Sequence, residues 1–365
     1  MFTAAALVLL LPLAGAASMG KPLAAYLQFP PKIPDVPHVP FSLPVFLGLA
    51  LLILVATVPL LLRLVSFRRK DGPRKLVIPF PRWGWASAGL GAVSWFLAWS
   101  RIPWMAGFQA HTFTPLWIAF ILIVNAFTVR RTGQCLMLSR TRTFLLLFPV
   151  SAGFWWAFEY LNRFVGNWNY VGGVEFGAAE YFLFATLPFS TVLPAVLSTR
   201  ELLLSCPRFD GAFREWRPLS PARPGAIGLV ALLLSCAGLF AVGIVPDFAF
   251  PLVWVAPPTL LISLAALRGE PHALSGIACG DWRPAVSSVL AALLCGFFWE
   301  MWNFGSYAKW VYAIPYVDAL HVFEMPLLGY AGYLPFGVLC AEVGDRFLTG
   351  RDAGGKLFSP PRQLR

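Results

Sequence analysis

Charged residues are scarce in this 365-residue chain. Asp, Glu, Lys and Arg make up 12% of it, about half the usual share of a soluble globular domain. Hydrophobic residues make up 58%, and the mean hydropathy is +0.70. A soluble fold of this size cannot cover so much apolar surface with so few charges. The same composition excludes disorder, because there is ample material to bury. We therefore expect a polytopic membrane protein.

Motifs for metals, nucleotides and disulfides are also missing. The six cysteines show no Cys-x-x-Cys spacing, and the four histidines are too scattered for a zinc or haem motif. There is no Walker A loop and no dinucleotide fingerprint. The Asp-rich motifs that hold magnesium diphosphate in prenyl transferases are absent from the sequence too. These gaps count against a nucleotide-driven pump and a diphosphate substrate, and we expect no metal and no cofactor.

Ten apolar stretches are long enough to cross the ~30 Å hydrocarbon core as helices. They are 3–19, 44–64, 83–100, 113–129, 143–161, 180–198, 225–245, 248–267, 284–302 and 325–344. The pattern predicts an all-α transmembrane bundle of about ten helices. The first stretch ends in small residues resembling a signal-peptidase site, but no basic region precedes it, so we favour a retained helix; cleavage would leave nine. Residues 29–44 are proline-rich, which predicts an extended connector.

The net charge of +11 has a simpler cause than a nucleic-acid partner. If the ends of the even-numbered stretches face the same side, 23 of the 28 Lys and Arg residues fall on that side. Basic residues concentrate in cytoplasmic loops. We therefore expect an integral protein of a bacterial inner membrane with a cytoplasmic C-terminus, in contact with the lipid bilayer and with no nucleic acid.

The chain repeats itself at an interval of about 142 residues. Each copy has Glu-x-x-Asn near a helix end, then Trp-x-Tyr, then a Glu that we expect at the start of the next helix. The matched residues are Glu159, Asn162, Trp168, Tyr170 and Glu180, and Glu300, Asn303, Trp310, Tyr312 and Glu324. We predict two parallel four-helix units, 83–202 and 225–348. An N-terminal extension, 1–82, would precede them and a cytoplasmic tail, 349–365, would follow.

The duplicated acids are candidate catalytic residues. An ionised side chain costs roughly 2.5–3.5 kcal/mol near the centre of a membrane helix, so such residues usually face a cavity or a partner. Four of the 17 acidic residues occupy duplicated positions near outer helix ends: Glu159, Glu180, Glu300 and Glu324. The Glu-x-x-Asn spacing puts an amide on the same helical face as the carboxyl. A carboxyl in a poorly hydrated aromatic pocket is a candidate proton donor, and the rings could stabilise a cation.

Candidates for substrate binding surround these acids. They are Asn162, Trp168, Tyr170, Trp299, Asn303, Trp310, Tyr312 and His321. The second unit is the better equipped, because it places Asp318 and His321 beside Glu324. A structural interpretation is also open: the acids could pair with Arg163 or Lys309 and pin the units together. The Trp and Tyr residues would then be the usual aromatic belt of a membrane interface.

These residues resemble a known pattern. Carotenoid-pathway membrane proteins of the lycopene-cyclase-domain type are helical repeats with a Gly-x-Trp-x-Tyr loop before a Pro-x-Glu-Glu helix start. Residues 166–170 look like that loop; residues 308–312 match it without the glycine, and 324–326 reverse the Pro-Glu order with a single Glu. Trp299-Glu300 looks like the Trp-Glu of related terpenoid cyclases and carotenoid hydratases. The resemblance implies cofactor-independent acid catalysis on an apolar polyene or lipid, with aromatic rings shielding a cation.

Three functions remain open at this point. The first is a membrane enzyme acting on an isoprenoid or other lipid through its outer-half acids. The second is a transporter or proton- or cation-coupled carrier with the acids at the interface between the units, although few acids lie deep in the bilayer. The third is a non-catalytic subunit of a membrane complex, which would have a membrane protein partner.

Overall fold

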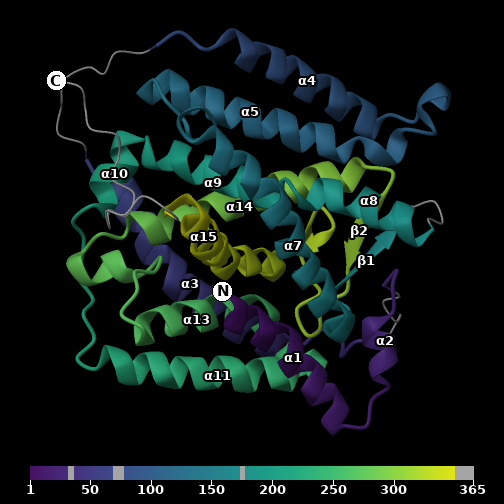
Figure 1. Ribbon diagram of the computed structural model, residues 1–365, viewed down its shortest axis with the longest axis vertical. Coiled ribbons are helices and arrows are strands. Elements are labelled where there is room, and N and C mark those ends of the chain that lie inside the picture. Colours follow the sequence, from purple (N-terminus) through teal and green to yellow (C-terminus); the bar gives the residue numbers. More distant parts are fainter. Residues whose placement is uncertain (32–36, 69–77, 173–176, 350–365) are drawn as a thin grey trace.

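The computed structural model describes residues 1–31, 37–68, 78–172 and 177–349. It is mostly helical, as the composition predicts (Figure 1). Apart from its first residue, the predicted tail lies outside the described residues, and so does part of the proline-rich connector.

Helices dominate the order of elements along the chain. The first part contains α1 (Phe2–Ser18), α2 (Leu23–Leu27), α3 (Leu43–Ser66), α4 (Arg82–Trp99), α5 (Phe113–Thr132), α6 (Leu136–Ser139), α7 (Thr141–Val165), β1 (Trp168–Val171), α8 (Ala178–Phe189), α9 (Val192–Leu204) and α10 (Pro207–Phe213). The second part contains α11 (Pro224–Ile244), α12 (Pro246–Ala249), α13 (Leu252–Leu267), α14 (Arg283–Gly305), β2 (Lys309–Tyr312), β3 (His321–Val322), β4 (Met325–Pro326) and α15 (Tyr333–Thr349). Short 3₁₀ turns η1 (Pro103–Met105), η2 (Gln109–His111), η3 (Ser275–Cys279) and η4 (Leu327–Gly332) connect them.

Seven helical segments of the described chain are long and apolar enough to cross a membrane. They are Leu43–Ser66, Gln109–Thr132, Thr141–Val165, Ala178–Leu204, Pro224–Ile244, Arg283–Gly305 and Leu327–Leu348. The chain is therefore an integral membrane protein, but the expectation of about ten spans is confirmed only in part. Helices α1 and α13 are apolar but only 17 and 16 residues long. Helix α4 is rich in Trp, Gly and Ser, and is not among the seven.

One predicted helix begins later than expected. The stretch predicted as helical from residue 325 opens with the strand β4, which pairs antiparallel with the preceding β3 in a small hairpin. Phe323 adopts a φ of 59° in the turn between the two strands. This left-handed conformation is incompatible with a continuing β-strand. The helix α15 starts only at Tyr333, after η4. Glu324 thus lies in a hairpin turn, and its predicted place at a helix start is wrong.

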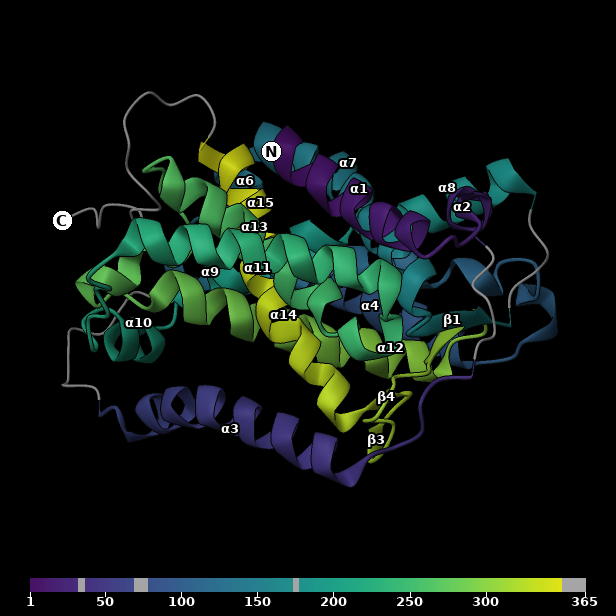
Figure 2. The same ribbon diagram turned by 90° about the horizontal axis from the view of Figure 1, so that it is seen from below.

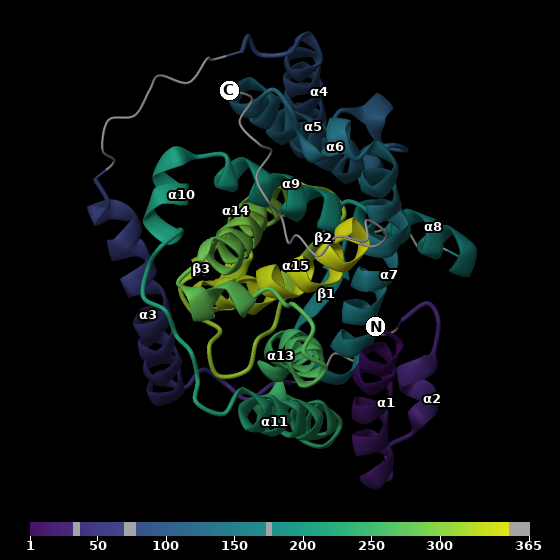
Figure 3. The same ribbon diagram turned by 60° about the vertical axis from the view of Figure 1, so that its left-hand side comes forward.

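Helix α1 packs against α11, and the two helices lie beside each other in Figure 3. A glycine of each helix lies at the contact. A Cβ on Gly15 would lie 2.1 Å from the carbonyl oxygen of Phe240, and one on Gly243 would lie 2.0 Å from that of Pro12. Small residues allow this close approach between membrane helices. Lys21, just after α1, donates its Nζ to the Gly243 oxygen at 2.9 Å. The first apolar stretch is therefore a packed helix of this fold.

Basic loops gather at one end of the bundle, the end marked by α10 in Figure 1. Arg140 donates to the carbonyl oxygen of Leu348 at 2.5 Å, and Arg63 donates to that of Ala212 at 2.8 Å. The strands β1 and β2 lie at the opposite end. The loops that carry most of the described basic residues are thus neighbours in space.

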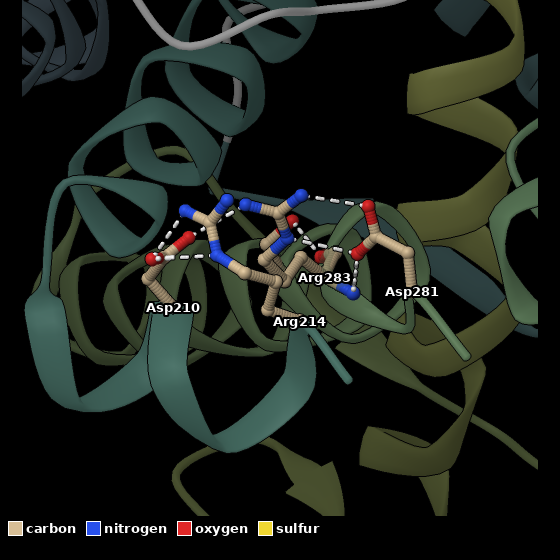
Figure 4. A network of polar contacts seen from close by, with 5 residues as sticks. Asp210, Arg214, Asp281 and Arg283 are labelled. Carbon is tan, nitrogen blue, oxygen red and sulfur yellow. Dashed lines mark hydrogen bonds and ion pairs between the residues drawn. The ribbon is translucent and has the colours of Figure 1, made fainter. Parts of the chain in front are cut away.

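Asp210 joins two arginines at this basic end (Figure 4). Arg283 Nη1 lies 2.6 Å from Asp210 Oδ1, and Arg214 Nη2 lies 2.6 Å from Oδ2. Arg283 also reaches both carboxylate oxygens of Asp281. Partial burial by itself would raise the pKa of Asp210, but the hydrogen bonds and charges of the two arginines lower it below the ordinary Asp value. The network ties α10 to α14.

The glycine contact predicts a position-specific loss of stability. Gly243→Ala should lower the free energy of unfolding by about 1–3 kcal/mol, because its methyl group would meet the backbone of α1. Gly225→Ala on the same helix is the control, since a Cβ at that position would have no neighbouring atom within 4 Å. Thermal unfolding in detergent micelles measures both. Equal stability of the two variants would contradict the contact.

The Asp210 network predicts a pH-dependent contribution to stability. A carboxyl whose pKa is lowered on folding stabilises the fold above its unfolded pKa of about 3.9 and loses that contribution as the pH falls through its folded pKa. Asp210→Asn should therefore cost about 1 kcal/mol at neutral pH, and the difference from wild type should vanish in strong acid. Unfolding midpoints measured against pH test this. Asp318→Asn, at an exposed pair with His321, should show little effect at any pH.

Candidate functional site

Two glutamates lie inside the helix bundle at the end that carries β1 and β2. Glu159 on α7 is 1% exposed, and Glu300 on α14 is fully buried. Among the described residues, neither forms an ion pair. Lys309 pairs with Glu324 instead, and Arg163 donates to the carbonyl oxygen of Tyr26. The structural interpretation, in which the acids pair with Arg163 or Lys309, therefore applies to Glu324 and not to Glu159 or Glu300.

Three aromatic donors hold one oxygen of Glu159. Tyr170 Oη, Trp155 Nε1 and Trp168 Nε1 lie 2.6, 3.0 and 3.2 Å from Glu159 Oε1. Trp155 comes from the same helix, one turn before the acid, and the other two come from β1. The second oxygen, Oε2, is buried and has no hydrogen-bond partner among the described residues.

Two phenols hold one oxygen of Glu300 in a similar way. Tyr312 Oη and Tyr333 Oη donate to Glu300 Oε1 at 2.8 and 2.7 Å. Trp310 Nε1 donates to the Tyr312 hydroxyl at 2.8 Å and so orients it. Burial, together with the neighbouring Glu300, raises the pKa of Tyr312 well above its usual value, so its hydroxyl keeps its proton. Glu300 Oε2 also has no partner among the described residues.

The donors around each carboxyl form a cage: Tyr170, Trp155 and Trp168 around Glu159, and Tyr312 and Tyr333 around Glu300. The two cages differ in one donor. Gly296 lies one turn before Glu300, at the position that corresponds to Trp155 before Glu159. A Cβ on Gly296 would lie 2.4–2.6 Å from ring atoms of Tyr333. The missing side chain thus makes room for the Tyr333 ring, which enters from α15 and supplies a hydroxyl donor.

Two asparagines fix the strands that carry the donors. Asn303 Nδ2 donates to the Trp310 carbonyl oxygen at 2.7 Å, and the Trp310 N–H donates to Asn303 Oδ1 at 2.9 Å. Asn162 makes the corresponding bonds, with its Nδ2 2.7 Å from the Trp168 oxygen and its Oδ1 accepting from the N–H groups of Asn167 and Trp168. The asparagines therefore bind the strand backbone. The Glu-x-x-Asn spacing led us to expect that they would hold the carboxyls, and they do not.

The clamped strands form one antiparallel ribbon. β1 pairs with β2 so that Trp168 lies opposite Tyr312 and Tyr170 lies opposite Trp310. Each cage thus has one donor strand, and the two donor strands hydrogen-bond to each other. The ribbon therefore connects the donors of Glu159 to those of Glu300, although the two glutamates lie far apart in the sequence.

A block of rings fills the interior beside the cages. Phe336, fully buried on α15, lies 5.8 Å from Trp155 and 6.3 Å from Trp299, measured between ring centroids. Trp299 stacks on Tyr333 at 5.9 Å. The predicted candidate Trp299 is therefore part of this aromatic packing next to the Glu300 cage.

The remaining candidates lie outside the cages. Glu180 lies on the exposed first turn of α8, where its carboxylate accepts from the N–H of Gly177 at 3.2 Å. Glu324 forms a partly exposed pair with Lys309. His321 is exposed and pairs with Asp318. Of the four predicted acids, the structure buries Glu159 and Glu300 and leaves the other two near the surface.

The cages are closed. Two hollows on the described part of the chain are an aromatic groove along one face of α4 and a recess between α3, α9, α10 and α14. Neither is lined by a residue that donates to a caged carboxyl. Tyr170 is the most exposed of the donors, with 44% of its surface accessible, so it covers Glu159 from the outside.

Sequence reasoning missed Trp155 and Tyr333 as members of the site. The signal was present for Trp155, because it stands one helical turn before a candidate acid. For Tyr333 the signal was indirect: the second unit has Gly296 where the first has an indole, so another residue must fill that space.

Comparison with models of protein families, with curated proteins and with solved structures finds no significant match to this chain.

The asparagine clamps predict a measurable loss of stability. Asn303→Ala should lower the free energy of unfolding by about 1–3 kcal/mol, because it leaves the N–H and C=O of Trp310 without their partner. Asn162→Ala should have a similar effect at Trp168. Asn169→Ala, a half-exposed asparagine on β1, is the matched control. If all three variants unfold like wild type, the clamps do not stabilise the ribbon.

Proposed function

We propose that this integral membrane protein is an enzyme that uses Glu159 and Glu300 for acid–base chemistry on an apolar lipid. One observation carries the proposal. Each carboxyl is buried without an ion pair, has one oxygen held by phenol or indole donors, and leaves its other oxygen unpartnered among the described residues.

This arrangement is costly for a residue with only a packing role. A buried polar atom without a hydrogen bond costs about 1–3 kcal/mol, and such atoms are few in folded proteins. Here the same cost occurs twice, on two helices and in two cages of related design. Carboxyls in unusual surroundings concentrate at functional sites, where an oriented oxygen can give or take a proton.

The chemistry that fits is proton transfer at carbon. One carboxyl would protonate a carbon–carbon double bond and leave a carbocation next to the aromatic block. The face of an aromatic ring attracts a cation, so the rings around Phe336 would stabilise it. A carboxylate would then remove a proton from a neighbouring carbon and form a new double bond. Such an isomerisation or cyclisation is redox-neutral, and its protons balance.

A neutral, unsaturated lipid is the substrate class that suits these surroundings. All the donors that reach the two carboxyls are phenols or indoles, not cations. The resemblance to lycopene-cyclase-domain proteins points the same way, towards an isoprenoid. Because the cages are closed, substrate entry requires a side chain to move, and Tyr170 is the most exposed candidate.

We further propose that the two cages belong to duplicated units, 83–202 and 225–348. The clamp of Asn162 on Trp168 has its counterpart in Asn303 on Trp310. The register of β1 against β2 is the one that a two-fold axis between the units would produce, because each Trp of the ribbon lies opposite the Tyr of the other strand. This arrangement supports a parallel duplication around an axis along the membrane normal.

The basic end of the bundle is proposed to face the cytoplasm of a bacterial cell. Loops with most of the described Lys and Arg residues are neighbours at that end, and the positive-inside rule assigns such an end to the cytoplasmic side. The caged carboxyls would then lie in the outer half of the membrane.

Conservative variants of the acids test the proposal. In cells that express the chain, untargeted mass spectrometry of extracted membrane lipids should reveal an isoprenoid or related lipid converted by the wild type. Glu300→Gln and Glu159→Gln should each reduce that conversion at least about a hundredfold, because glutamine cannot transfer the proton. Glu201→Gln is the control, since Glu201 accepts from the Leu136 N–H at the opposite end and glutamine keeps that acceptor.

Other outcomes separate the alternatives. Unchanged conversion in folded Glu300→Gln and Glu159→Gln proteins would exclude the enzyme. Proton-coupled or cation uptake into proteoliposomes, lost in the same variants, would instead identify a carrier. A fixed stoichiometric protein partner with no lipid conversion would identify a non-catalytic subunit.

A further inference from the structure

Helix α3 is the most apolar candidate span and also the least buried. Its mean hydropathy is 2.8, yet 0% of its most apolar 18-residue stretch is buried inside the protein. The corresponding share is 33–61% for the other six spans. Even the stripe that is least exposed, Ile53, Thr57, Leu60 and Leu64, is only half-buried. Figure 2 shows α3 lying apart from the body of the bundle.

Contacts at its two ends hold α3 in place. At its start, the Ser42 N–H donates to the Tyr316 carbonyl oxygen at 2.9 Å. At its end, Arg208 on α10 donates Nε to the Leu64 oxygen at 3.1 Å and Nη2 to the Val65 oxygen at 2.7 Å. In the described part of the chain, the hydrogen bonds that connect α3 to the bundle thus lie at its two ends.

A recess opens at the inner tether. Its lining combines residues of four helices and the loop after α9: Leu64, Val65, Leu203, Cys206, Arg208, Phe209 and Leu290. The lining is apolar except for the guanidinium of Arg208 and the thiol of Cys206. Since a guanidinium carries five N–H donors, the two bonds to α3 leave Arg208 capacity for an anionic ligand.

An apolar stripe on α14 leads away from this recess. It starts at Leu290 and continues through Leu294, Phe297, Met301 and Phe304, a spacing of three and four residues that keeps one helical face. All five side chains are half-buried or exposed. The outer end of the stripe meets Phe323, whose ring lies 5.8 Å from that of Phe304. The stripe therefore offers an apolar track from the inner to the outer end of α14.

We propose that the recess between α3 and α14 binds an anionic membrane phospholipid, with its phosphate on Arg208 and one acyl chain along the α14 stripe. This site is separate from the caged carboxyls, so it does not depend on the proposed enzymatic function.

Charge and polarity select this occupant. A phosphate headgroup complements the single cation in an apolar recess, and an arginine holds phosphate oxygens through paired N–H donors. Further basic residues at the same end, such as Arg63 and Arg68, add attraction for an anionic headgroup, worth about 1 kcal/mol for each residue near the surface. An acyl chain can fill the space beside a helix that no described segment of the chain buries. A zwitterionic lipid would gain the apolar contacts but less of the electrostatic attraction.

Native mass spectrometry of the full chain in detergent micelles tests the site. Phosphatidylglycerol or phosphatidylcholine with identical acyl chains is added, and retained lipid is counted. Wild type should retain phosphatidylglycerol at least about fivefold better, because one basic side chain contributes about that factor at an anionic surface. Arg208→Gln should lower that preference about fivefold, and Arg208→Lys should restore part of it because it keeps the charge. Arg223→Gln, an exposed arginine at the same end but outside the recess, should leave it unchanged.

A second variant covers the case in which Arg208→Gln does not fold. Leu290→Trp should fill the recess and reduce retention of both lipids while Arg208 stays in place. Equal retention of the two lipids by wild type would overturn the proposal, as would unchanged retention in a folded Arg208→Gln or Leu290→Trp protein. A second copy of the chain or a partner protein that Leu290→Trp releases would also overturn it, because the recess would then be a protein interface.

Discussion

The arrangement of the site depends on two asparagine side chains that hold strand backbone at the end of a helix bundle. A membrane helix satisfies its own backbone groups, but the chain that leaves it does not, and buried N–H and C=O groups need partners. Asn162 and Asn303 supply them by binding Trp168 and Trp310. This fixes the direction of both strands, allows β1 and β2 to pair, and directs the phenols of the strands onto the two carboxyls.

The two cages arrive at the same result by different packing. Around Glu159 one further donor comes from the helix itself, through Trp155. Around Glu300 that position is Gly296, and Tyr333 from α15 occupies the space. In both, the donors converge on one oxygen and leave the other without a partner in the described chain. What the two sites share is thus a buried carboxyl with one oriented oxygen, the state that the proposed proton transfer requires.

The sequence predicted a large part of this without the fold. All ten apolar stretches contain helix, the basic loops are neighbours, and Glu159 and Glu300 lie in aromatic surroundings. The errors have local causes. Hydropathy alone does not register a hairpin, so the α-helix of the last span starts only at Tyr333 and Glu324 lies in a turn. The motif spacing also did not distinguish an amide that orients a carboxyl from one that clamps a strand.

Composition by itself determined that the chain is a membrane protein built of helices, because so much apolar surface cannot be covered in water and a helix satisfies its own backbone in lipid. It also singled out a few acids by their rarity. Only the tertiary structure decided which of those acids are buried and which side chains surround them. The reason is that burial and hydrogen bonding arise from contacts between distant segments, such as Tyr333 with Glu300 or β1 with β2, and the local pattern of residues carries no record of those contacts.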